Sequence, residues 1–439
     1  MVLEQSRLSR CCRIRHSSHS LQTNPIVDPK IGQRIASILF ITQSLGSAAL
    51  ISNVTVNPII GAQLGGSDVL AGVPGTLLLI GAASASYPAG MIMQRLGRRP
   101  GLALGFLIGF VGMCIGGYAV VTHSFWMFLF GLLLIGGARG AVDQSRYAAA
   151  DANLPDARAR AISTVVFAGT VGAVCGPLLV APLGNLVKGL FGFDVLAGPM
   201  IGGAMLFLVS GILIFTLLRP DPRDIGRIIT DALKREDDPP PAAARPLNDI
   251  ARQPGIQLAA LSMLIGQAMM VLVMTVTSLH MKHYHHNLAD ISLVIMAHTL
   301  GMYGLSFLTG TIADRYGRPT VVSIGALVLL LGCFIAPIWT DVLPLAIALF
   351  LVGWGWNMCY IGGSSLLADN LAPSERGRYQ GGIELTVNLS SAVSSLSSGF
   401  IIAGLGFTTL CVIAGIIAFA PLIMITVQRT RAHIPSPQG

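Results

Sequence analysis

The stretch Ser306–Pro319 reads SFLTGTIADRYGRP, and a related stretch, Ser86–Pro100, reads SYPAGMIMQRLGRRP. Five residues of the earlier stretch recur 220 positions later: Ser86/Ser306, Gly90/Gly310, Arg95/Arg315, Gly97/Gly317 and Arg98/Arg318. A second related pair follows, Ala150–Arg160 (ADANLPDARAR) and Ala368–Arg378 (ADNLAPSERGR). Because repeats in the same order indicate a duplicated unit, the chain is predicted to fold as two similar halves.

Both repeats lie between long apolar segments. Of the 439 residues, 53% are hydrophobic and 11% are charged, with a mean hydropathy of +0.70, whereas soluble domains carry about 25% charged residues. Twelve segments are long enough to supply the roughly 20 helical residues that cross a bilayer core. The sequence therefore predicts an all-α membrane protein with twelve transmembrane helices in two pseudo-symmetric bundles of six.

Polar stretches divide the chain into five predicted parts. These are a cytoplasmic N-terminal tail over residues 1–30, a first bundle over 31–218, a cytoplasmic linker over 219–254, a second bundle over 255–428 and a cytoplasmic tail over 429–439. The linker is predicted as a polar loop because it carries many charged residues and the run PPPAAARP.

The basic residues predict the orientation in the membrane. The loops expected outside hold Lys188 and Lys282, whereas nearly all other Lys and Arg residues fall on the opposite side, apart from Arg139 within a segment. Because Lys and Arg concentrate in cytoplasmic loops, both termini are expected in the cytoplasm, with the chain in the cell inner (cytoplasmic) membrane. The same bias explains the net charge of +8, so the expected partner is the lipid bilayer and no nucleic acid is expected.

Soft metal donors stand in pairs on the seventh and eighth segments. Met270 and Met274 are four residues apart, as are His298 and Met302, and such positions share one helix face. Thioether and imidazole suit a soft ion such as Cu(I), and an ionisable residue inside a membrane usually faces a cavity or a partner. The alternatives are that the Met side chains fill gaps in the core and that His298 is a hydrogen-bonded structural residue.

The stretch GTIADRYGRP resembles the loop signature GxxxDRxGRR of the major facilitator superfamily, and the twelve-segment layout fits the same superfamily. The resemblance implies a secondary transporter whose two bundles rock around a central site. It also implies that the loop residues form contacts of a cytoplasmic gate, here Gly310, Asp314, Arg315, Gly317 and Arg318, with Arg95 and Arg98 in the first copy. Gln94 occupies the Asp position of the first copy, so charged gating contacts are expected to be stronger in the second half.

Within that superfamily, the chain resembles the CcoA-type copper importers of the CalT family. That group carries MxxxM on the seventh helix and HxxxM on the eighth, which Met270/Met274 and His298/Met302 match. The resemblance implies copper import for cytochrome c oxidase assembly, with copper as the transported substrate, no resident cofactor, and a periplasmic or cytoplasmic copper chaperone as a partner. A neighbouring branch of the superfamily carries riboflavin and lacks these donors.

Two further groups of residues are candidates for supporting roles. A loop expected on the outer side offers a site that collects metal before uptake, from Met281, His280, His283, His285 and His286. Charged residues within or near membrane depth are candidates for ion coupling or for structural ion pairs, namely Arg139, Asp143 and Glu384.

The sequence contains no P-loop or other hydrolytic signature, so neither an enzyme nor a primary pump is expected. The main prediction is copper import by alternating access, with the substrate bound near the membrane midplane between the bundles. Two alternatives stay open. One is transport of a small organic molecule such as riboflavin or a drug, and the other is a membrane metal sensor that does not transport.

Overall fold

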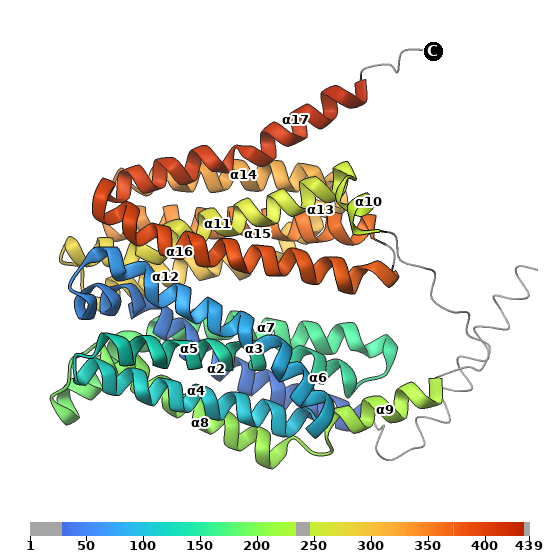
Figure 1. Ribbon diagram of the computed structural model, residues 1–439, viewed down its shortest axis with the longest axis horizontal. Helices are drawn as coiled ribbons and strands as arrows, with labels where there is room; N and C mark the ends of the chain where they lie inside the picture. The colour runs from blue at the N-terminus through green and yellow to red at the C-terminus, as the bar shows by residue number, and fades with distance from the viewer. Residues whose placement is uncertain (1–28, 234–245, 372, 434–439) are drawn as a thin grey trace, which may run out of the picture.

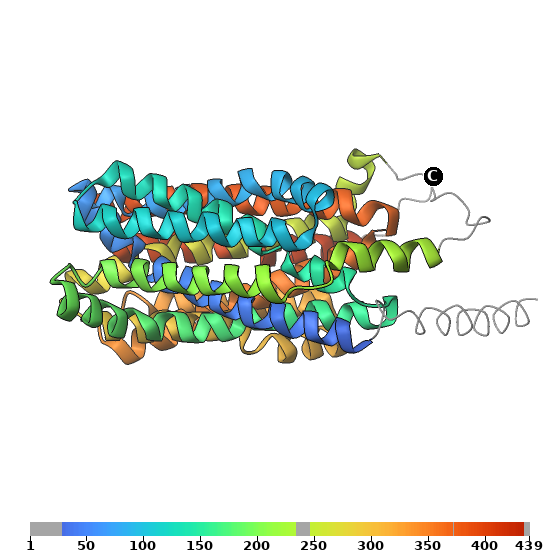
Figure 2. The same ribbon diagram turned by 90° about the horizontal axis from the view of Figure 1, so that it is seen from below.

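A computed structural model shows a helical chain, described over residues 29–233, 246–371 and 373–433, and no strand occurs in these ranges. In Figures 1 and 2 the long helices run roughly along the longest dimension of the molecule. The first half contributes α2 (Pro29–Gly65), η1 (Asp68–Gly72), α3 (Val73–Leu96), α4 (Arg98–Val121), α5 (Phe125–Val142), α6 (Ser145–Asp151), α7 (Pro155–Phe191) and α8 (Ala197–Leu217).

The second half contributes α11 (Pro254–His283), α12 (Leu288–Tyr303), α13 (Ser306–Tyr316), α14 (Arg318–Ile335), α15 (Val342–Asn370), α16 (Pro373–Ala418) and α17 (Ala420–His433). Across the described residues, eleven helical stretches are long and apolar enough to cross a membrane. The longest, Gly382–Gln428, is interrupted by the non-helical residue Gly406, and in Figure 1 the chain doubles back between the beginning of α16 and α17. It therefore holds two crossings, and the predicted architecture of twelve helices in two bundles is confirmed.

The repeated loops adopt the same backbone turn in both halves. α3 ends at Gly97, with φ 114° and ψ 161°, and α13 ends at Gly317, with φ 88° and ψ 153°. This positive φ is accessible to glycine and strained for residues with a Cβ atom. The two glycines therefore stop one helix and let the next begin at the following residue, at the same position of each repeat.

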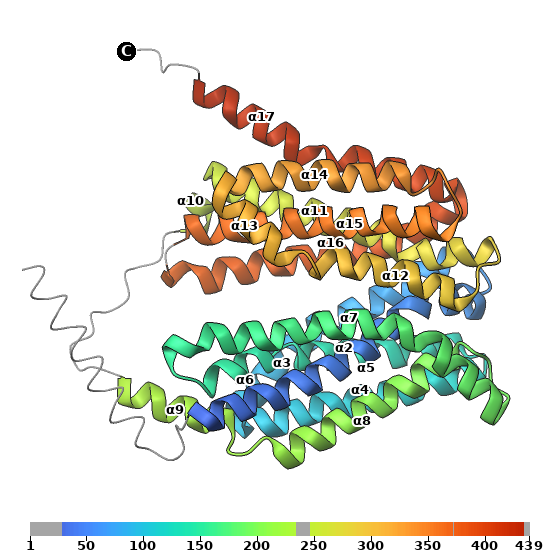
Figure 3. The ribbon, with the colours of Figure 1, turned by 180° about the vertical axis from the view of Figure 1, so that it is seen from behind.

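The two bundles lie as two layers, one above the other (Figures 1 and 3). We call the end that carries α9 (Pro222–Leu233) and α10 (Leu247–Ala251) the linker end, and the opposite end the distal end. Polar contacts join the bundles from mid-depth to the distal end: Thr299 Oγ1 to Ala173 O at 2.9 Å, Thr76 Oγ1 to Ala392 O at 3.2 Å, Ser395 Oγ to Gly72 O at 3.0 Å, and His283 Nε2 to Asp68 Oδ2 at 3.3 Å. The distal end is thus closed by direct contact.

The structure differs from the sequence prediction in three places. The fourth segment is broken between Val142 and Ser145, and the eighth is broken between Tyr303 and Ser306. The linker over 219–254 was expected to be a polar loop but contains α9 and α10. Of the predicted tails, residues 1–28 and 434–439 lie outside the described residues.

Candidate functional site

His298 lies in the core of the second bundle, and no part of its surface is exposed. Its Nδ1 is 2.8 Å from the backbone oxygen of Leu349 on α15. Because a carbonyl oxygen can only accept, Nδ1 carries the hydrogen, and in the neutral ring Nε2 keeps its lone pair. Nε2 is buried and has no hydrogen-bond partner in the structure, so His298 satisfies only half of its hydrogen-bonding capacity.

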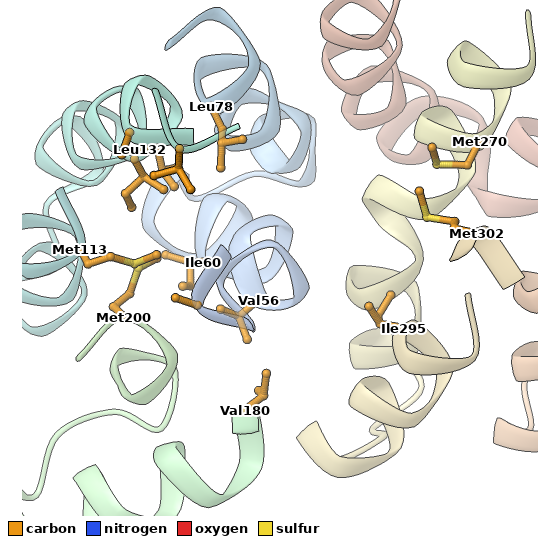
Figure 4. Close-up of a cluster of buried hydrophobic side chains, with 14 of the residues drawn as sticks. Val56, Ile60, Leu78, Met113, Leu132, Val180, Met200, Met270, Ile295 and Met302 are labelled. Atoms are coloured by element: carbon orange, nitrogen blue, oxygen red, sulfur yellow. The ribbon is translucent and has the colours of Figure 1, made fainter. Parts of the chain in front are cut away.

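The predicted methionine donors lie near the boundary between α11 and α12. Met270 is 3% exposed and Met302 is 9% exposed, while Met274 is half-buried. Figure 4 shows the side chains of Met270 and Met302 extending toward one another from the two helices. The structure therefore brings together one methionine from each predicted motif.

The residues predicted to collect metal at the distal end have separate partners. His283 pairs with Asp68 across the bundles, His286 Nε2 lies 2.8 Å from the backbone oxygen of Thr340, and the His280 ring stacks on Phe407 with centroids 4.0 Å apart. Met281 is buried and His285 is exposed. Among the described residues, no three His, Cys, Asp or Glu side chains gather in a group that suits a metal ion. Metal capture at this loop stays a prediction.

The sequence did not predict an aromatic row that lies on the second bundle. Trp356 and Tyr360, one turn apart on α15, stack with ring centroids 5.2 Å apart, and Tyr303 of α12 meets Trp356 edge-on at 6.0 Å. Trp356 is buried and donates from Nε1 to Gln267 Oε1 of α11 at 2.6 Å, whereas Tyr303 is 38% exposed. The only sequence signal was the spacing of four residues between Trp356 and Tyr360. Tyr303 and Gln267 join them through tertiary packing.

Charged side chains of the first bundle face this row. Arg139 Nε of α5 and Asp143 Oδ2, at the C-cap of that helix, lie 3.7 Å apart, as their spacing suggested, and both side chains are about half exposed. Tyr303 is within electrostatic reach of both. Exposed charges on a membrane-spanning helix indicate a surface that faces water between the bundles. The aromatic row, Gln267 and the Arg139–Asp143 pair form what we call the inter-bundle cluster.

Glu384 extends the inter-bundle cluster toward the linker end. Its carboxylate accepts a short hydrogen bond from the hydroxyl of Tyr360. Tyr360 is also within electrostatic reach of Arg146 on α6 of the opposite bundle. Arg139, Asp143 and Glu384, predicted as coupling candidates, therefore lie around one aromatic row, and coupling itself stays a prediction.

The repeated loops hold ion pairs inside each bundle. Arg98 Nε lies 2.9 Å from Asp151 Oδ2, and Arg318 Nε lies 3.4 Å from Asp369 Oδ2. The four residues occupy matching positions of the two repeats. Of the other predicted gating residues, Arg95 and Arg315 are exposed, Gly310 lies within α13, and the side chain of Asp314 lies outside the described residues. The gating role stays a prediction.

Comparison with known proteins identifies the family of the chain. The model of the Major Facilitator Superfamily matches residues 37–287 and 258–438. The chain is 35% identical over 418 residues to YdeG, an uncharacterized MFS-type transporter of Bacillus subtilis (strain 168), covering 94% of this chain and 96% of YdeG. It is 29% identical over 385 residues to the riboflavin transporter RfnT of Brucella anthropi, covering 88% of this chain and 93% of RfnT.

Solved structures share the fold at low sequence identity. The POT family transporter PepTSo matches with a TM-score of 0.66 and 12% identity, over 90% of this chain and 98% of that chain. The repeated loops, the two six-helix bundles and the relatives that match over nearly their full length all indicate the same family. The chain belongs to the Major Facilitator Superfamily and is a multi-pass membrane transporter.

Proposed function

We propose that this transporter carries a small organic molecule with a flat aromatic ring system, of the riboflavin class. The observation that carries the proposal is the inter-bundle cluster, in which aromatic rings on one bundle lie within electrostatic range of a charged pair on the other. Flat rings bind well against aromatic side chains, which add about 0.5–1.5 kcal/mol per ring pair beyond area burial.

The polar groups of the inter-bundle cluster suit the rest of such a molecule. Gln267 and Tyr303 offer hydrogen-bonding groups beside the rings, and Arg139 and Asp143 offer a cation and an anion on the facing bundle. Riboflavin combines a flat heterocycle with a polar hydroxyl chain, so it needs both kinds of surface. The similarity to RfnT supports this class of substrate.

The site lies where a rocking carrier binds its substrate. Arg139, Trp356 and Gln267 fall near the middle of the spans Phe125–Asp151, Val342–Leu367 and Pro254–His283. Midplane binding between two repeats lets each bundle contribute one wall, so that rocking exposes the same site to either side. We place the linker end in the cytoplasm and expect uptake across the cytoplasmic membrane.

The test is uptake of radiolabelled riboflavin by riboflavin-requiring bacteria that lack other flavin carriers. The wild-type protein should give saturable uptake that other flavins compete away. Tyr303→Ala should raise the KM about fivefold, since loss of one ring contact costs roughly 1 kcal/mol. Tyr118→Ala, which removes a 63% exposed ring from peripheral α4, is the matched control and should leave the KM unchanged. Uptake no greater than in cells without the protein, at equal membrane levels, would exclude riboflavin.

A second candidate substrate is copper, and the unpartnered Nε2 of His298 favours it. Histidines that bind metal usually donate their other ring N–H to a carbonyl or carboxylate, as His298 does to Leu349. Met302 stands four residues after His298 on α12, and its side chain and that of Met270 on α11 extend toward one another (Figure 4). A site built from these donors would suit Cu(I).

Radiocopper uptake separates the two candidates. Met302→Leu keeps the side-chain volume, so its stability cost should stay under about 1.5 kcal/mol. If copper is the substrate, Met302→Leu and His298→Leu should each abolish most copper uptake at unchanged protein levels, and Tyr303→Ala should not. Full copper uptake in the Met270→Leu/Met302→Leu/His298→Leu variant would remove copper as a candidate.

A further inference from the structure

The start of the linker binds the repeated loop of the first bundle through Asp221. One carboxylate oxygen accepts from the backbone N–H of Arg98 at 3.0 Å and of Arg223 at 2.9 Å. The other accepts from the backbone N–H of Arg99 at 3.0 Å. Arg98 and Arg99 are the first residues of α4, where backbone N–H groups lack helical partners. The carboxylate therefore binds the positive end of the α4 dipole.

Arg223 binds the other side of the same turn. Its Nη1 donates to the backbone oxygens of Arg95 at 2.8 Å and Gln94 at 3.3 Å, at the end of α3. Asp221 and Arg223 thus satisfy the N–H groups that begin one helix and the carbonyl groups that end the previous one. Gly97 makes the contact possible, because a Cβ atom at this position would lie 2.4 Å from Asp221 Oδ2.

α9 continues this attachment with an apolar face. Ile225 is 1% exposed and Ile229 is fully buried. A Cβ atom at Gly226 would lie 3.2 Å from the Cβ of Asp151, whose carboxylate holds Arg98. α9 therefore packs beside Asp151 and Arg98, next to the turn between α3 and α4 that Asp221 and Arg223 bind.

The second end of the linker is attached to the other bundle. Ile250 of α10 is 1% exposed and packs in a hydrophobic cluster with Ile256 and Leu371. α9 therefore belongs to the first bundle and α10 to the second, and the connection between the bundles runs between these two helices.

We infer that Asp221 is a positioning residue of the transport cycle. The first repeat carries Gln94 where the second carries Asp314, and Asp221 brings a carboxylate to this loop from outside the repeat. It acts through Arg98, whose backbone it holds and whose guanidinium bridges to Asp151. The loop, α9 and the first bundle consequently move as one rigid body when the bundles rock.

The test is hydrogen–deuterium exchange on the full-length protein in lipid nanodiscs. In Asp221→Asn, backbone amides over 98–99 and 223–233 should exchange about tenfold faster or more, because these N–H groups lose their charged acceptor. Helices of the second bundle and the melting temperature should stay unchanged. The matched control is Asp224→Asn, which removes the same charge three residues later in α9, together with a half-exposed ion pair to Arg223. Its exchange should match wild type, because exposed ion pairs contribute little.

Riboflavin uptake gives a second reading of the same variants. Asp221→Asn should lower the maximal rate at least threefold with an unchanged KM, because the loop lies away from the inter-bundle cluster. Unchanged exchange in Asp221→Asn, or an equal increase in Asp224→Asn, would overturn the inference. A wild-type protein that does not transport riboflavin would count against the proposed substrate alone, since the exchange measurement needs no substrate.

Discussion

Single residues in the second bundle show two ways of holding a polar group inside a membrane protein. Trp356 is buried, and its indole N–H has a partner in Gln267, so the polar atom is satisfied within the inter-bundle cluster. His298 is fully buried, but its Nε2 has no hydrogen-bond partner in the structure. A buried polar atom without a partner costs roughly 1–3 kcal/mol. That cost is easiest to understand if a ligand or a water molecule binds Nε2 in the working protein.

The Trp356–Gln267 bond gives a prediction at this scale. Gln267→Leu should destabilise the protein by about 1–3 kcal/mol, because the indole N–H is left buried and unpaired. Trp356→Phe removes the donor, so adding Gln267→Leu to it should cost much less than in the wild type. Thermal unfolding of the four proteins in one detergent measures this coupling. Additive losses would mean that the hydrogen bond contributes nothing.

The elements were predictable in number and order, but their breaks and the aromatic row were not. Apolar length alone locates the crossings, and the repeated glycines locate the turns between α3 and α4 and between α13 and α14. The break after Tyr303 falls in largely apolar surroundings, where average hydropathy changes little. The break after Val142 falls at the polar residues Asp143–Ser145, close to the predicted end of that segment. α9 was missed because its few apolar residues stand among charged residues and a glycine in PRDIGRIITDAL, a composition that also suits a loop. Contacts between helices remote in sequence assembled the rest of the site.

The crossing of η1 and α16 carries a prediction at the element scale. A Cβ atom at Gly72 would lie 1.9 Å from the backbone oxygen of Ser395, and backbone cannot move away as a flexible side chain can. Gly72→Ala should therefore prevent distal closure and reduce transport at least tenfold, while the protein still inserts. A Ser395→Cys reporter, in a background without native cysteines, should become reactive toward a membrane-impermeant maleimide added on the distal side.

Gly404→Ala is the matched control for this experiment. Gly404 lies on α16 as well, but nothing stands within 4 Å of a Cβ atom built there. The control should transport normally and keep the Ser395→Cys reporter protected. If the reporter stays protected in Gly72→Ala, the contact between η1 and α16 tolerates the methyl group. The prediction that this close approach is needed for distal closure would then be wrong.

At the scale of the whole molecule, a symmetric scaffold carries an asymmetric site. The ion pairs Arg98–Asp151 and Arg318–Asp369 follow the repeat, and sequence comparison of the two halves was sufficient to find their positions. The aromatic row lies on one bundle and the Arg139–Asp143 pair on the other. Such a site has no repeated pattern to reveal it, and it exists only once the two bundles face each other.

The distribution of charge over the molecule predicts its orientation. Basic residues gather at the linker end, for example Arg98, Arg223 and Arg318 beside the repeated loops, whereas Lys188 and Lys282 stand near the distal ends of α7 and α11. Because short loops rich in Lys and Arg stay in the cytoplasm, the linker end should face inward. An epitope after Gly439 should then be reached by antibody only in permeabilised cells. An epitope inserted after Gly192, in the turn between α7 and α8, should be reached in intact spheroplasts. The two insertions control for each other, because an inverted orientation would reverse the accessibility of both epitopes. Detection of the C-terminal epitope in intact spheroplasts would place the distal end, rather than the linker end, in the cytoplasm.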